Sequence, residues 1–259
     1  MGMVIANFNT LQKSKKYLGS CCNNKFVIVD CRGLNVDKKS KSDFASKFIR
    51  KHEVDSAIFL EKSNCMNVLV EIFEKYGSES ESFGNVTLLI AKLLGLKHGK
   101  VEMKDNAALV NGNSKKQSVS MNIKFSEVRR INNGEKNCIY VKMGEPHLVY
   151  LVNNIKKINL LKIGKKIQKK YPRGVNVDAI QKLDETHYLI RTYERGVFAE
   201  TSSCGTGSLS AYMTISRLGG KTSGRSIEFK SSGGIHWVSQ NKNMLKLETY
   251  KSYCKIKSL

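Results

Sequence analysis

The chain has 259 residues, 41% of them hydrophobic, which allows one large domain or two of ordinary size. Its 44 Lys and Arg against 22 Asp and Glu give a net charge of +22, which would attract nucleic acid, anionic membranes or acidic metabolites. No run of about 18 apolar residues is present, and the first residues lack a signal-peptide pattern. We therefore expect a cytoplasmic protein, whose seven cysteines are mostly free thiols and form no metal-ligand pattern.

Predicted strands and helices alternate along the first half of the chain. Residues 25–33 form an apolar, β-branched run that is typical of a buried strand, and residues 41–52 predict a helix with a Ser or Asp cap. Residues 56–62 and 67–77 predict two more strands. The next segments predict a short apolar helix that ends near Gly95 and then strands joined by an Asn-Gly turn, over residues 83–96 and 100–125.

The second half repeats this order. Strands are predicted first, then a helix rich in lysine, another strand, a helix closed by glycines and two final strand segments, over residues 137–152, 153–174, 187–196, 205–220, 226–239 and 244–256. In the lysine-rich segment, Ile155, Ile158, Leu161 and Ile163 fall near helical spacing, which predicts an amphipathic helix with a solvated lysine face. Such a face could bind phosphates, but no RNA-binding aromatic motif accompanies it, so nucleic acid is not the favoured partner.

Residues 70–95 and 189–220 resemble each other. Each has a strand, an aromatic residue followed by Glu and a cation, a polar turn, and a glycine that opens a helix. The matching runs are Phe73-Glu74-Lys75 with Tyr193-Glu194-Arg195, and Phe83-Gly84-Asn85 with Cys204-Gly205-Thr206. The chain therefore divides into two related halves, residues 1–116 and 117–259.

Cys204 stands at the start of a predicted helix with glycines after it. A helix N-terminus offers unpaired N–H groups and a positive dipole end, and glycine lets a small anion approach them. Two such N-termini that face each other could hold one carboxylate, and the same field lowers the pKa of a thiol. A thiolate at Cys204 could then remove the Cα proton of a bound amino acid without a cofactor, and a second acid on the opposite face would return a proton with inversion.

These residues resemble the signature of the diaminopimelate epimerase family. Tyr193-Glu194-Arg195-Gly196 and the Cys204 turn are similar to its Glu-Arg-Gly run and Cys-Gly-Ser/Thr-Gly turn. Weaker matches follow in order along almost the whole chain, at residues 23–30, 72–85, 143–149, 174–181 and 231–238. The resemblance implies an α+β fold of two pseudo-symmetric domains, each with strands wrapped around a central helix and with the active site in the cleft between them. It also implies a cofactor-independent epimerase, racemase or isomerase that acts on an amino acid or related small acid, and it allows a homodimer.

The resemblance also assigns roles by position. Cys204 becomes a catalytic acid or base, and no metal ligand is implied. The substrate carboxylate would bind to backbone N–H groups of Gly84, Asn85, Gly205, Thr206 and Gly207. The rest of the substrate would bind to Asn24, Asn176, Glu194 and Arg195. Arg195 suits a distal carboxylate by bidentate pairing, and Glu194 suits a distal ammonium group.

The site departs from the family pattern at several positions. The family's other catalytic cysteine falls on Phe83, whose ring cannot carry a proton, so a symmetric two-thiol mechanism is excluded. Glu74 and Glu145 replace family asparagines and favour a more cationic substrate. Glu74, Glu145, Asp55 and the thiols of Cys21 and Cys22 are the candidates for the second acid.

Two other interpretations stay open beside an epimerase of altered substrate. One is an isomerase of the phenazine-biosynthesis type, which uses a single carboxylate at the position of Asp55; the presence of Cys204 argues against it. The other is a catalytically silent relative that binds an amino-acid-like ligand or nucleic acid. His147, which follows Pro146, is expected to be structural and hydrogen-bonded to the backbone.

Overall fold

The computed structural model describes residues 4–81, 84–104, 106–122, 127–131 and 138–259. The helices are α1 (Phe8–Lys13), α2 (Lys38–His52), α3 (Asn85–Leu93), α4 (Leu160–Gln168) and α5 (Gly205–Arg217), with the 3-10 helices η2 (Ile155–Lys157) and η3 (Lys251–Tyr253). The strands of the first half are β1 (Val4–Ala6), β2 (Lys16–Cys21), β3 (Asn24–Asp30), β4 (Leu34–Val36), β5 (Ser56–Glu61), β6 (Val68–Glu74), β7 (Glu79–Ser80), β8 (His98–Met103), β9 (Asn106–Gly112) and β10 (Lys116–Asn122). Those that follow are β11 (Glu127–Arg130), β12 (Cys138–Met143), β13 (Glu145–Leu151), β14 (Asn176–Lys182), β15 (His187–Glu194), β16 (Ala199–Thr201), β17 (Ile227–Ser231), β18 (Gly234–Asn241), β19 (Met244–Tyr250) and β20 (Cys254–Ser258).

The two halves have the same strand topology. In the first half β3 pairs in parallel with β5 and β6 with β8, and in the second half β13 pairs in parallel with β14 and β15 with β17. Antiparallel pairing of β10 with β19 joins the halves, and β20 returns to pair with β2. Apart from the β1–β4 pair, the strands form one closed sheet. The division at residue 116 stays a proposal, since it falls where β10 begins and β20 pairs with the first half.

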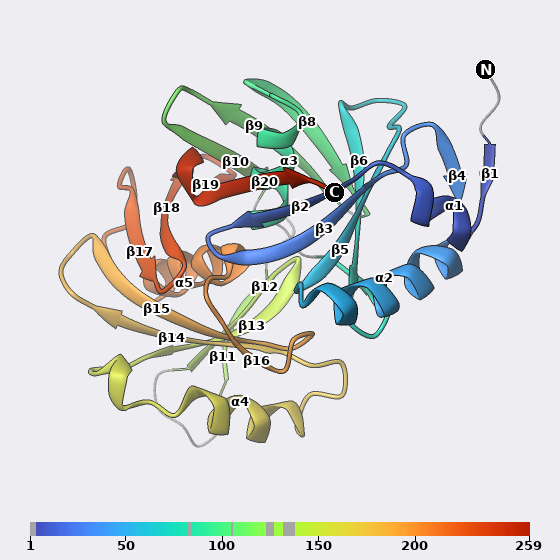
Figure 1. Cartoon of the computed structure of the whole chain (residues 1–259). Helices are drawn as coiled ribbons and strands as arrows, with labels where there is room; N and C mark the ends of the chain where they lie inside the picture. The colour runs from blue at the N-terminus through green and yellow to red at the C-terminus, as the bar shows by residue number, and fades with distance from the viewer. Residues whose placement is uncertain (1–3, 82–83, 105, 123–126, 132–137) are drawn as a thin grey trace.

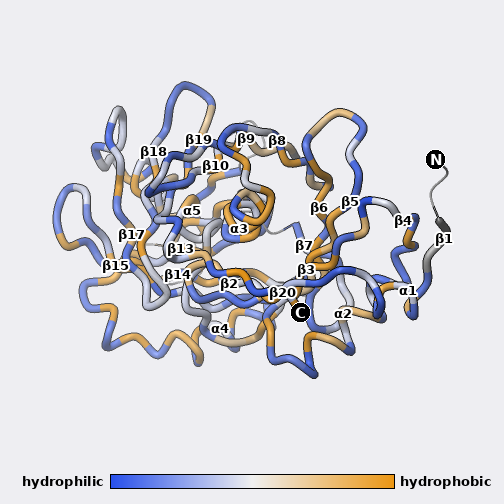
Figure 2. The backbone as a smooth tube through the Cα atoms, turned by 45° about the horizontal axis from the view of Figure 1, so that its top comes forward, coloured by the Kyte–Doolittle hydropathy of each residue, from blue (hydrophilic) through white to orange (hydrophobic). Residues whose placement is uncertain are grey.

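A central helix lies inside the strands of each half (Figure 1). In α3 every residue from Asn85 to Ala91 is buried, because apolar side chains cover all sides of this short helix. Figure 2 shows this helix as a hydrophobic coil within the ring of strands. The helix α5 is buried over most of its length in the same way. The α+β fold with strands around central helices is therefore as the sequence predicts.

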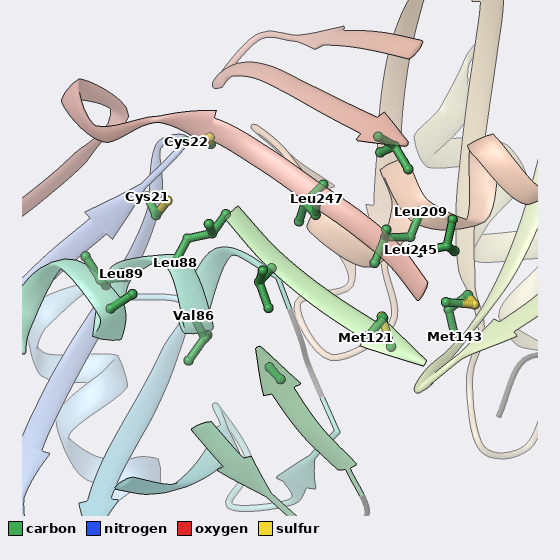
Figure 3. Close-up of a cluster of buried hydrophobic side chains, with 14 of the residues drawn as sticks. Cys21, Cys22, Val86, Leu88, Leu89, Met121, Met143, Leu209, Leu245 and Leu247 are labelled. Atoms are coloured by element: carbon green, nitrogen blue, oxygen red, sulfur yellow. The ribbon is translucent and has the colours of Figure 1, made fainter. Parts of the chain in front are cut away.

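One hydrophobic cluster continues through both halves. It includes Leu88 and Leu89 of α3, Leu209 of α5, and Leu245 and Leu247 of β19, all of which are buried (Figure 3). Two smaller clusters lie under the outer helices, one between α2 and the strands β3 and β5, the other between α4 and the strands β14 and β15. The main cluster therefore holds the two halves together along the β10–β19 pair.

The lysine-rich helix is shorter than the sequence predicts, and its buried face is different. Asn159 caps it through a hydrogen bond from the backbone N–H of Lys162, so the α-helix begins at Leu160. Its buried residues are Leu160, Gly164 and Ile167, whereas Leu161 is 42% exposed. The predicted face from Ile155 to Ile163 is wrong because Asn154 and Asn159 cap two separate helical segments.

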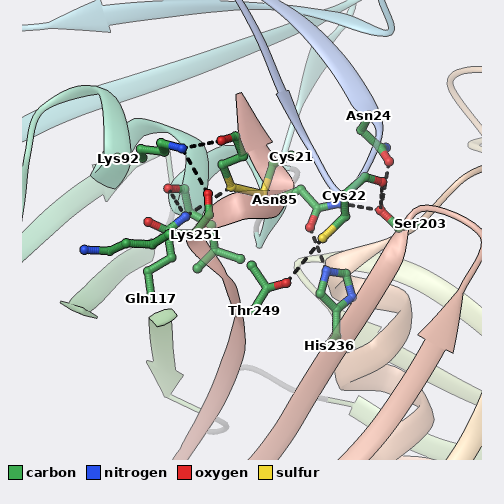
Figure 4. The surroundings of a disulfide bond; sticks show 12 residues. Cys21, Cys22, Asn24, Asn85, Lys92, Gln117, Ser203, His236, Thr249 and Lys251 are labelled. Carbon is green, nitrogen blue, oxygen red and sulfur yellow. Dashed lines mark hydrogen bonds between the residues drawn. A yellow bond between two sulfur atoms is a disulfide. The ribbon is translucent and has the colours of Figure 1, made fainter. Parts of the chain in front are cut away.

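Cys21 and Cys254 form a disulfide between β2 and β20 (Figure 4). The other cysteines, Cys22, Cys31, Cys65, Cys138 and Cys204, are free, in keeping with the expectation of mostly free thiols. None of the helices in the described ranges is long and apolar enough to cross a membrane.

Candidate active site

The N-termini of the two central helices meet. Cys204 is the N-cap of α5, and Gly84, with a φ of 86°, is the N-cap of α3. A Cβ atom on Gly84 would lie 3.0 Å from the Cα of Gly205, and one on Gly205 would lie 3.0 Å from the Cα of Gly84. This close approach needs glycine on both sides. The two helix N-termini that the repeat predicts to face each other are thus close together.

A cavity of about 460 Å³ opens beside the start of α5, between the two halves. Seven of the predicted residues line it: Glu74, Glu145, Asn176, Glu194, Arg195, Cys204 and Thr206. The residues Asn24, Asp55, Gly84, Asn85, Gly205 and Gly207 are not among those that line it. Phe83 lies outside the described residues. The roles assigned to all these residues stay predictions.

The thiol of Cys204 is held from several sides. Its Sγ atom accepts a hydrogen bond from the backbone N–H of Gly207 at 3.3 Å and lies 3.3 Å from Oγ1 of Thr206. The carboxyl group of Glu194 also lies near the thiol. Burial raises the pKa of Cys204 well above its ordinary value, and the charges of Glu194 and Asp178 act in the same direction. The prediction of a lowered pKa is wrong, because burial and these two carboxyl groups outweigh the helix N-terminus.

Behind the thiol lies a chain of buried polar side chains. Nε2 of His147 is 3.0 Å from Oγ1 of Thr206, and Nδ1 is 2.7 Å from Oδ2 of Asp178. The other oxygen of Asp178 accepts a hydrogen bond of 2.6 Å from Thr192. His147 is therefore bonded to side chains and not to the backbone as predicted. Asp178 was not anticipated, although its place two residues after Asn176 on the strand beside His147 could have indicated it.

Two carboxyl groups occupy equivalent places in the two halves, Glu74 at the end of β6 and Glu194 at the end of β15. Burial raises the pKa of Glu194 to about 8, and the nearby charges of Glu74 and Asp55 contribute to the rise. Burial and then the charge of Glu145 raise the pKa of Glu74 to about 7. Both groups therefore exchange protons near neutral pH, which is useful in acid–base chemistry.

Arg195 forms an ion pair on the wall of the cavity. Its Nη2 atom contacts Oε2 of Glu145, and its Nη1 atom donates to the backbone oxygen of Arg173 at 3.0 Å. The other carboxylate oxygen of Glu145 accepts hydrogen bonds from Oγ of Ser80 at 3.1 Å and from the backbone N–H of Glu81 at 2.9 Å. The guanidinium group predicted to bind a distal carboxylate thus already has a carboxylate partner.

Asn24 and Asn85 belong to a separate buried network (Figure 4). The side chain of Asn85 donates to Ser203 at 2.9 Å and lies 2.9 Å from Nε2 of His236, and Ser203 donates to Oδ1 of Asn24 at 2.9 Å. These bonds link the first half to the turn that carries Cys204. The two asparagine side chains thus position that turn, and their contact with substrate stays a prediction.

The remaining candidates for a second acid are held elsewhere. Asp55 accepts a hydrogen bond of 2.7 Å from the backbone N–H of Lys25. Cys21 is in the disulfide, and Cys22 is buried beside Thr249, where burial raises its pKa to about 11. Within the part of the chain that the structure describes, no group of three His, Cys, Asp or Glu side chains could hold a metal ion.

Comparisons with known proteins agree with this architecture. The sequence model of the family described as diaminopimelate epimerase matches residues 139–252. The diaminopimelate epimerase of Aquifex aeolicus is 30% identical over 208 residues, covering 71% of this chain and 75% of that protein. The diaminopimelate epimerase of Methanocella arvoryzae is 28% identical over 241 residues, covering 82% and 85%. A phenazine biosynthesis protein of the PhzF family from Bacillus anthracis has the same fold, with a TM-score of 0.70, 13% identity and coverage of 95% and 98%.

Two similar halves, close helix N-termini and a thiol on the wall of the cavity, together with relatives that are epimerases, define an enzyme of the isomerase class. Within that class, the chain belongs to the diaminopimelate epimerase family. The resemblance that the sequence motifs indicate is confirmed.

Proposed function

We propose that the protein moves a proton at the Cα of an amino acid or related small acid, with Cys204 as the acid–base group on one face. The observation that supports this most is the position of the thiol, which caps α5 on the wall of the cavity, with Glu194 near it on the same wall. The backbone at the start of α5, where Thr206 lines the cavity, would hold the substrate carboxylate, and the field of the helix N-terminus would stabilise the negative charge that develops there.

The proton transfer requires Cys204 to lose its own proton first. Glu194 lies near the thiol on the wall of the same cavity and has a pKa of about 8, so its carboxylate is the group that would accept that proton. The thiolate then takes the Cα proton: the C–H bond breaks, an S–H bond forms, and the electron pair moves into the bound carboxylate. Thr206, fixed by His147 and Asp178, keeps the sulfur in place throughout.

The face of the substrate on which the proton is returned determines whether the reaction inverts Cα or shifts a double bond. The family's second thiol is replaced by Phe83 in this sequence. This replacement favours a second candidate, an isomerase in which one group removes a proton and returns it on the same face at another carbon. Inversion at Cα would instead require a carboxyl group or a water molecule on the face opposite Cys204.

Incubation in D₂O with a panel of cationic, neutral and acidic amino acids tests the proposal. We expect deuterium at Cα of at least one substrate, and loss of this exchange in Cys204→Ser. Cys65→Ser, which changes an exposed free thiol, is the matched control and should keep the activity. Chiral chromatography of the product separates inversion from exchange with retention, and NMR detects a moved double bond. Absence of exchange across the panel, or exchange that persists in Cys204→Ser, would overturn the proposal.

A further inference from the structure

Acidic side chains outnumber basic ones around the cavity. Four glutamates and two arginines line it: Glu74, Glu79, Glu145, Glu194, Arg173 and Arg195. Glu79 lies in ion pairs with Lys38 and Lys104, which approach from outside the cavity. The other three glutamates and the two arginines therefore have to neutralise one another or a bound ligand.

The positive charge of Arg195 is not available to neutralise a bound anion. Glu145 already pairs with its guanidinium group, and this glutamate is only 5% exposed and is held by Ser80 and Glu81. Breaking the pair to admit another anion would leave a buried carboxylate without a counter-ion, which is costly. A substrate with a distal carboxylate is disfavoured for this reason.

Glu74 lies beside this ion pair and lacks a cation of its own. Its carboxyl group is next to Gly196, where a Cβ atom would lie 3.2 Å from the carboxyl carbon and from one of its oxygens. It accepts a hydrogen bond from Ser56 and is close enough to Glu145 to feel its charge. Among the described residues Glu74 forms no ion pair.

The two ends of the cavity thus differ in what they can bind. Glu194 lies near Cys204 and belongs to the end of the cavity at which we propose the reaction. Glu74 and Glu145 lie against the backbone and the guanidinium group of the Arg195-Gly196 pair, which is the region predicted for the far end of the substrate. A positively charged group beside Glu74 would give that carboxylate the counter-ion that it lacks, while Glu145 keeps its pair with Arg195.

On this geometry we infer that the enzyme selects an amino acid whose side chain ends in a cation, and that Glu145 excludes a distal carboxylate by occupying Arg195. The inference rests on the proposed Cα proton transfer and adds the substrate class. Glu74 binds the distal cation directly, and Glu145 sets the specificity.

Matched ligands test the inference. Lysine and ornithine carry the distal ammonium group, norleucine has the length of lysine without the charge, and 2-aminoadipate and diaminopimelate carry a distal carboxylate. Calorimetric titration with the intact protein at pH 8 should show that lysine or ornithine binds at least about tenfold more tightly than norleucine or 2-aminoadipate, because a buried carboxylate left unpaired is unfavourable. Equal or tighter binding of the dicarboxylic ligands would overturn the inference.

The specificity residue has its own test. Glu145→Asn restores the family's residue and frees Arg195, so the preference should move toward 2-aminoadipate or diaminopimelate by about tenfold or more. Glu200→Asn breaks another Glu–Arg pair of the same half, with Arg191, outside the lining of the cavity, and should leave the preference unchanged. If the two variants behave alike, Glu145 does not set specificity.

Binding and exchange are measured separately, so the two proposals fail in different ways. Selective binding of a cationic amino acid without deuterium exchange would support the inferred substrate class and overturn the proposed proton transfer. Exchange at Cα with diaminopimelate only would retain the proton transfer and overturn the substrate class.

Discussion

The acid–base roles proposed for Cys204 and Glu194 predict an activity that depends on pH. Because both groups have raised pKa values, the free enzyme holds them protonated at low pH and cannot form the thiolate. We expect kcat/KM for Cα exchange to rise with pH through about 8, where Glu194 ionises. Glu194→Gln should lower kcat by about 100-fold and abolish the rise of kcat/KM with pH. Glu200→Gln should leave the pH profile unchanged. A profile that is flat between pH 6 and 9 would contradict this role.

Glu74 links pH to stability. Its pKa is raised from 4.5 to about 7 in the folded protein, so the folded state binds this proton more tightly than the unfolded chain. The stability that the proton provides is fully present below about pH 4.5 and is lost as the pH rises through about 7.

Glu74→Gln should therefore raise the free energy of unfolding at pH 8 by on the order of 1–2 kcal/mol more than at pH 5. Urea denaturation at both pH values measures the difference. Glu185→Gln, at an exposed side chain, is the control and should show the same effect at both values. A larger gain at pH 5 than at pH 8 would show that Glu74 is not buried as a neutral acid.

Single residues of the site could be predicted where a motif carries them. Glu194, Arg195 and Cys204 stand in one short signature, and all three line the cavity. The ion pair of Arg195 with Glu145 could not be predicted, because the two residues are 50 positions apart and meet only through the packing of two strands and a turn. The direction of the pKa of Cys204 likewise depends on burial and on Asp178, which the sequence does not show to be near.

At the scale of elements, helix α4 packs on the sheet through a glycine. A Cβ atom on Gly164 would lie 2.4 Å from the ring of Tyr193, a side chain that is 1% exposed. Gly164→Ala should lower the free energy of unfolding by about 2 kcal/mol, because the added methyl group would force the buried ring or the helix to shift. Gly33→Ala, where nothing lies within 4 Å of the added atom, should stay within about 0.5 kcal/mol of the wild type. Thermal unfolding of the two variants gives the comparison, and equal changes would contradict the close packing.

Most elements could be predicted because their patterns are local. The apolar runs of β3, β5 and α3 and the glycines after α5 lie where the sequence places them. The lysine-rich helix shows the opposite case: apolar residues at helical spacing suggested one long face, but two asparagine caps divide the segment. Hydrophobic spacing alone does not reveal such a break when the caps are common polar residues.

At the scale of the whole molecule, the closed sheet and the shared core couple the two halves. The repeat predicts the halves, but the return of β20 to β2 and the β10–β19 pair are long-range contacts without a local signal. Because the main hydrophobic cluster extends from Leu88 of α3 to Leu209 of α5, neither half has a complete core by itself.

We therefore expect one cooperative unfolding transition. The fluorescence of Trp237, which lies in the second half, and hydrogen exchange of the amides of α3 in the first half should report the same midpoint in urea. Leu247→Ala, which removes a buried side chain between Gly84 and Gly205, should shift both midpoints together, by about 2–5 kcal/mol in the free energy of unfolding. Two separate midpoints would show that the halves unfold independently.

The pair between Glu145 and Arg195 also has a consequence for competition in the cell. A carboxylate that is tethered beside its partner acts as a competitor with an effective concentration on the order of millimolar or more. Free dicarboxylic amino acids would have to exceed this effective concentration to displace Glu145 from Arg195. Because Glu145 is part of the chain, its effective concentration does not fall on dilution. Glu145 would thus act as an intramolecular competitor that keeps dicarboxylic amino acids from binding to Arg195. The single substitution Glu145→Asn would remove this competition.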